Sequence, residues 1–113
     1  MRGIESPRLP RYAHAMSLEQ IRSQIDAIDA QMITLLAQRQ PLVLQAAQLK
    51  SDTAAVRAAD RRAAMMERLG TLADAEGVSR SVVMNVWTAM IDSFIALELE
   101  EHARHQEEAA SRS

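Results

Sequence analysis

Apolar residues recur at alternating steps of three and four between Ser17 and Lys50, which is the spacing of one face of an α-helix. This apolar stripe consists of Ile21, Ile25, Ile28, Met32, Leu35, Leu42, Ala46 and Leu49. Ser17 and Gln20 have the spacing of a capping box, in which the hydroxyl and the amide each satisfy a free backbone N–H. The pattern predicts a first helix of roughly 33 residues, about 50 Å long, ending near Lys50 or Ser51.

Pro41 lies inside this predicted helix. Proline has no N–H to donate to the Ala37 carbonyl, and it disfavours helical backbone at Gln40. We expect a kinked but continuous helix, and a break into two helices is the alternative.

Two further helices follow the turn signal at residues 51–53. The second is predicted at about residues 57–75 and ends before Gly77, a natural residue for the left-handed position after a helix. The third, capped by Ser79 or Ser81, is predicted to run to about Arg104. The inward positions are Met65, Met66, Leu69 and Leu72 in the second helix and Val83, Trp87, Met90, Ile91, Phe94 and Leu97 in the third.

These elements make up one predicted helical domain at residues 17–106. Residues 1–16 contain two of the three prolines and no apolar segment typical of a secretory signal, so we interpret them as a flexible leader. Residues 107–113 are polar, and we expect a disordered tail.

Composition supports an all-α class and narrows the function. Of 113 residues, 48% are hydrophobic but only 3% are aromatic, and strong helix formers dominate. The absence of Cys excludes disulfides and thiolate metal sites, the three His form no convincing metal set, and we expect no metal and no cofactor. A net charge of −2 does not favour nucleic acid. We expect no segment with the length and apolar composition of a transmembrane helix, and no membrane partner. With no signal and no Cys, we expect a cytoplasmic protein.

The expected helix lengths indicate an assembly. The first helix is predicted to be about twice as long as the second, so much of its apolar stripe would lie beyond its partners and remain exposed. Pairing two copies would cover that stripe, and we therefore expect a helical homodimer.

Arg39 occupies a position in the stripe where an apolar residue is expected, between Leu35 and Leu42. A buried guanidinium is costly unless an anion meets it. Lys50 lies 11 residues later, about 20° round the helix and about 16 Å along it, so both cations can reach one small ligand. Arg22 is about 25 Å from Arg39 and about 100° round, so it could join that ligand only from the partner chain.

Other charges lie at or beside apolar faces. Arg57, Arg61 and Arg62 begin the second helix, and Glu98 follows Phe94 by one turn. A carboxyl buried there is favoured in its protonated form, which can donate a hydrogen bond. The alternatives are a structural ion pair between Arg39 and Glu98, a favourable charge at the helix end for Lys50, and a solvated surface for the others.

One combination of these residues resembles the all-helical chorismate mutase family. It comprises Ile21-Arg22-x-x-Ile25-Asp26-x-Ile28-Asp29, Leu35-Leu36-Ala37-x-Arg39, Lys50 and Val56-Arg57-x-x-Asp60-Arg61. The resemblance extends over about residues 17–104, although the third helix matches mainly in its length and apolar pattern. It implies three helices in an intertwined homodimer whose two sites are built from both chains.

The resemblance also implies the rearrangement of chorismate, a small dicarboxylate, to prephenate without a metal or a covalent intermediate. Arg22 of the partner chain would bind one carboxylate, and Arg39 the other or the developing charge. Lys50 would hold the ether oxygen, Arg61 would close the site over a carboxylate, and a protonated Glu98 would donate to the ether oxygen. Arg57 would assist in binding the substrate.

Two departures from the family keep other functions open. Many members have acids at the positions of Ala58 and Arg62 that help read the substrate hydroxyl. The segment from Ala54 to Met65 is similar to the sister branch that releases pyruvate from isochorismate to form salicylate, whereas Glu98 favours the mutase. The alternatives are therefore an isochorismate-pyruvate lyase and a non-catalytic helical dimer module.

Overall fold

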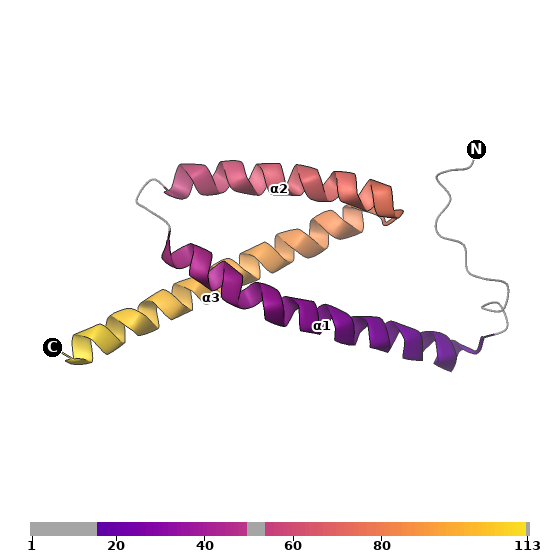
Figure 1. Ribbon diagram of the computed structural model, residues 1–113, viewed down its shortest axis with the longest axis horizontal. Coiled ribbons are helices and arrows are strands. Elements are labelled where there is room, and N and C mark those ends of the chain that lie inside the picture. Colours follow the sequence, from indigo (N-terminus) through magenta and orange to yellow (C-terminus); the bar gives the residue numbers. More distant parts are fainter. Residues whose placement is uncertain (1–15, 50–53, 113) are drawn as a thin grey trace. The chain divides into compact units, whose positions relative to one another are not determined.

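The computed structural model describes residues 16–49 and 54–112, and within these ranges it contains three α-helices and no strand (Figure 1). They are α1 (Leu18–Gln48), α2 (Ala54–Glu76) and α3 (Arg80–Arg112). The predicted all-α class with three helices is confirmed. The chain divides into two compact units, Met1–Leu42 and Val43–Ser113.

α1 begins with the predicted capping box. The Ser17 backbone N–H donates to Gln20 Oε1 at 2.8 Å, and the Gln20 N–H donates to Ser17 Oγ at 3.1 Å. The helix continues through Pro41 to Gln48, so the prediction of a continuous helix is confirmed. It ends slightly before the expected boundary, and Lys50 lies outside the described residues.

The apolar stripe of α1 is open to solvent in this chain. None of the α1 side chains is fully buried, and the exposed fraction is 50% for Ile25, 55% for Ile28 and 61% for Leu35. A helix is stabilised in water mainly by packing of its apolar face rather than by intrinsic propensity. The stripe is therefore an apolar surface along α1.

α2 and α3 form a hairpin around Gly77, which adopts the left-handed conformation with φ 74°. The Val78 N–H donates to the Ala73 carbonyl at 2.9 Å, and the Gly77 N–H donates to the Asp74 carbonyl at 3.3 Å. These two bonds are a Schellman motif. Ser79 then caps α3, because its Oγ accepts from the Val82 N–H at 3.3 Å. The predicted stop at Gly77 and the predicted cap at Ser79 are both confirmed.

The buried core of the described residues lies in the second half of α2, where that helix packs against α3. Leu69 is 8% exposed and Ala73 4%, and Gly70 is also buried. Leu69 was predicted to face inward, but the same prediction for Leu72 is wrong, because its side chain is 49% exposed. The predicted α3 stripe is partly buried throughout, at Val83, Trp87, Met90, Ile91, Phe94 and Leu97.

Two predicted helix boundaries require correction. α2 begins at Ala54 rather than near residue 57, and α3 continues to Arg112 through residues that were assigned to a disordered tail. Glu, Gln, Ala and Arg dominate residues 106–112, and their high helix propensity extends α3 without tertiary packing. With 31, 23 and 33 residues, α1 is also not twice as long as α2.

α3 is long and apolar enough to cross a membrane, judged by length and composition alone. One 18-residue window within it has a mean hydropathy of 1.5. The expectation that no segment has these properties is wrong by that criterion. A single helix of this kind is weak evidence for a membrane span, because core helices of soluble proteins have the same composition.

Candidate functional site

Arg39 is the cationic residue within the apolar stripe of α1, and it lies in the continuous part of that helix. Its side chain is only partly exposed, whereas Leu35 and Leu42 on either side are 61% and 63% exposed. Three or four residues separate it from each of these neighbours, so all three share one face of the helix. Any partner that covers the stripe must therefore also accommodate a positive charge.

Arg22 lies in the first half of α1, and its side chain is exposed. Because α1 is continuous, the 17 residues between Arg22 and Arg39 correspond to about 25 Å of helix. The two guanidinium groups of one chain therefore cannot meet on one small ligand.

Two further predicted site residues lie near the junction of α1 and α2. Lys50 lies outside the described residues. Arg57 belongs to the first turns of α2, but its side chain also lies outside the described part.

Arg61 and Glu98 lie on the two helices of the hairpin. The Arg61 side chain on α2 is exposed, and the Glu98 side chain on α3 is partly buried. Arg22 and Arg39 belong to the first unit, whereas Arg61 and Glu98 belong to the second. The structure thus places the four described residues by element, two in each unit.

Two ion pairs that sequence reasoning missed join α2 to α3. Arg62 Nη2 lies 3.1 Å from Asp92 Oδ1, and Arg80 Nη2 lies 2.9 Å from Asp74 Oδ2. Arg62 precedes Asp74 by 12 residues, and Asp92 follows Arg80 by 12 residues. The equal steps show that the antiparallel register continues without a slip from one pair to the other. Gly77 lies midway in sequence between the two residues of each pair. An antiparallel hairpin centred on this predicted helix end would therefore have predicted both ion pairs.

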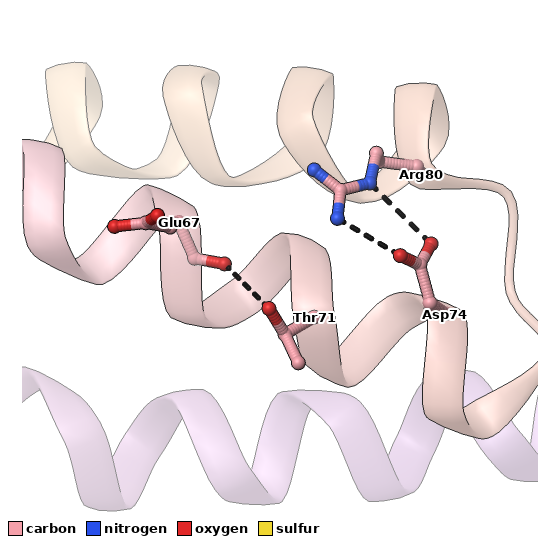
Figure 2. A network of polar contacts seen from close by, with 4 residues as sticks. All are labelled: Glu67, Thr71, Asp74 and Arg80. Carbon is pink, nitrogen blue, oxygen red and sulfur yellow. Dashed lines mark hydrogen bonds and ion pairs between the residues drawn. The ribbon is translucent and has the colours of Figure 1, made fainter.

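The Arg80 side chain lies over α2 beside the turn, where its Nε and Nη2 atoms donate hydrogen bonds to the two carboxylate oxygens of Asp74 (Figure 2). A Cβ atom at Gly70 would lie only 2.5 Å from Arg80 Nη1, so the missing side chain leaves room for the guanidinium. The hydrogen bond from Arg80 holds the pKa of Asp74 below its usual value, and the same bond raises the pKa of Arg80. One turn earlier, Thr71 Oγ1 donates to the Glu67 carbonyl at 3.3 Å. The Arg80–Asp74 contact thus joins the start of α3 to the last turns of α2.

In the described part of the chain, no group of three or more His, Asp or Glu residues is arranged to hold a metal ion. The cations singled out from the sequence are arginines and a lysine, whose side chains bind anions rather than metals. Their chemistry suits a substrate with carboxylate groups.

Comparison with known proteins bears on the whole domain. Residues 21–99 match the family model described as chorismate mutase type II, and this range includes most of α1, all of α2 and much of α3. No curated protein and no solved structure matches the chain. The match extends over more than half of the sequence and agrees with the three-helix architecture, and on this basis the chain belongs to the chorismate mutase type II family.

Proposed function

We propose that this protein is a chorismate mutase, which rearranges chorismate to prephenate. The observation that carries the proposal is the family match over residues 21–99, because this range contains all six predicted site residues. They are Arg22, Arg39, Lys50, Arg57, Arg61 and Glu98. The absence of nucleic acid and membrane partners and the cytoplasmic location stay predictions.

The residue types suit this reaction. The rearrangement is unimolecular, so the protein has to select a compact substrate conformer and stabilise the charge that grows on the breaking C–O bond. Arginine forks bind the two carboxylates, with Arg39 and Arg61 supplied by one chain. Lys50 and a protonated Glu98 donate hydrogen bonds to the ether oxygen. No nucleophile and no cofactor are required.

We propose further that the working form is a homodimer with two shared sites. The exposed stripe of α1 supports this, because its heptad spacing is the spacing that pairs two helices along one face. Arg22 of the partner subunit would supply the second carboxylate contact, since Arg22 cannot approach Arg39 within one continuous α1. The dimer thus explains both the uncovered apolar face and the charge within it.

A paired turnover assay tests the activity. Purified protein is given chorismate, with detection of prephenate, and isochorismate, with detection of salicylate and pyruvate. We expect turnover of chorismate. Efficient release of salicylate would instead assign the chain to the lyase branch. A folded protein that is silent with both substrates would contradict the proposal and leave the non-catalytic helical module.

Glu98 provides a test of the mechanism within the proposed site. Glu98 must carry its proton to donate to the ether oxygen. The Glu98→Gln variant keeps a hydrogen-bond donor and should retain turnover of chorismate, whereas Glu98→Ala removes the donor and should lower kcat. An equal loss of kcat in both variants would remove Glu98 from this role.

A further inference from the structure

The α2–α3 hairpin is tight at its turn and wider toward the start of α2 (Figure 1). At the tight end, Gly70 and Ala73 are small and buried, which allows the two helices to approach closely. At the wider end, Arg62 reaches across to Asp92 with a long side chain. The two ends are therefore held by different means, small-residue packing near the turn and a long ion pair farther out.

The register of the hairpin relates this ion pair to the predicted site. Glu98 follows Asp92 by six residues and so lies level with Val56, six residues before Arg62. Arg61, the neighbour of Arg62, lies level with Ser93. The levels of Arg61 and Glu98 therefore differ by five residues, which is about 7.5 Å along the helices. This offset is one component of the distance between the two residues, and the spacing between α2 and α3, which diverge away from the turn, is the other (Figure 1).

We propose that Arg62 and Asp92 are positioning residues, which set the spacing between α2 and α3 and thereby the separation of Arg61 from Glu98. The inference rests on the proposed mutase function. Arg62 is 38% and Asp92 60% exposed, and an ion pair this open to solvent contributes little to stability. Removing the pair should therefore leave the protein folded, so that a change in turnover reports the positions of Arg61 and Glu98.

Three variants measure the effect on turnover. Arg62→Ala removes the pair, and we expect kcat/KM to fall about 10-fold, mostly in kcat, because a misplacement of about 1 Å can already cost about 100-fold in rate. The exchanged variant R62D/D92R restores a pair across the same gap and should recover most of this loss. Arg80→Ala removes the other Arg–Asp pair, where core packing and the Schellman motif already hold the helices, and should change kcat/KM less than twofold.

A distance measurement separates the spacing from the activity. The chain has no Cys, so nitroxide labels can be attached uniquely to Cys introduced at Ala58 and Ala96, two exposed positions that lie level in the register. Diluting labelled with unlabelled protein removes signals between subunits. The label-to-label distance distribution should broaden or shift in Arg62→Ala, should return in the exchanged variant and should stay unchanged in Arg80→Ala.

The outcomes distinguish the two proposals. If the wild-type protein turns over no chorismate, the function proposal fails, and the label distances still decide whether Arg62 and Asp92 set the spacing. If chorismate is turned over and Arg62→Ala keeps full kcat/KM, the positioning role is wrong. Equal losses in Arg62→Ala and Arg80→Ala would also overturn it, because both pairs would then have only a general structural effect.

Discussion

At the scale of single residues, the ion pair at the hairpin turn uses the space left by the glycine at position 70. Arg80 crosses α2 at Gly70 and binds Asp74, and both charged side chains are more than half exposed. The depressed pKa of Asp74 means that its contribution to stability is present above the carboxyl's unfolded pKa and is lost as pH falls through the folded value. The Arg80–Asp74 contact therefore contributes at neutral and weakly acidic pH and is lost in strong acid.

Replacing Gly70 by Ala sets helix propensity against this contact. Alanine stabilises a helix interior by up to about 1 kcal/mol relative to glycine. The new Cβ displaces the guanidinium, which is the mobile end of a long side chain, and the pKa of Asp74 should rise toward its usual value. We expect a slightly raised melting temperature and a shifted Asp74 titration by NMR.

Arg80→Ala is the matched control, because it removes the same ion pair without changing the backbone of α2. Its Asp74 titration should match that of Gly70→Ala. A lower melting temperature in Gly70→Ala than in Arg80→Ala would mean that the guanidinium cannot move aside and that the glycine is required by close packing.

At the scale of helices, local patterns predicted what local chemistry controls. Three helix ends are determined by hydrogen bonds between residues only a few positions apart: the start of α1 by Ser17 and Gln20, the end of α2 by Gly77 and the start of α3 by Ser79. All of these residues were recognisable in the sequence. The extension of α3 to Arg112 was missed, because polar residues predict solvent exposure and do not exclude a helix. Arg62 and Asp92 are 30 residues apart, so their pairing depends on hairpin register rather than on any local pattern.

Pro41 disfavours the helix in which it lies. It leaves the Ala37 carbonyl without its helical donor, yet α1 continues through it. Pro41→Ala restores the N–H and relieves the ring clash, so the free energy of unfolding should rise by up to about 3 kcal/mol. Chemical denaturation followed by circular dichroism measures the change.

Gln40→Ala is the control for Pro41→Ala, because it changes the adjacent exposed position and leaves the backbone donor in place. It should alter the stability only slightly. If Pro41→Ala raised the free energy of unfolding no more than Gln40→Ala does, tertiary packing rather than helix propensity would determine the stability of this part of α1.

At the scale of the whole molecule, the helical domain and the family could be predicted from the sequence, whereas the assembled site could not. The heptad spacing of α1 and the arginine within it are visible in one chain. The arrangement of Arg22, Arg39, Arg61 and Glu98 depends on how the two units and two proposed subunits come together, which no periodicity specifies. The site is thus best tested by an experiment that assembles it from different chains.

Mixing two inactive variants provides that experiment. Arg22→Ala and Arg39→Ala should each lose most turnover of chorismate. If Arg22 of the partner subunit completes the site around Arg39, a mixed dimer has one site with both changes and one site with neither. Random pairing makes half of the dimers mixed, so the mixture should recover about one quarter of the wild-type rate.

The control mixture combines Arg39→Ala with Arg61→Ala, two residues proposed to come from the same chain at one site. Every site in that mixed dimer lacks one arginine, so no activity should return. Tagged subunits verify that exchange takes place in both mixtures. Recovery in neither mixture despite exchange would mean that Arg22 of the partner subunit does not complete the site around Arg39. Recovery in both would mean that Arg39 and Arg61 also reach the site from different chains.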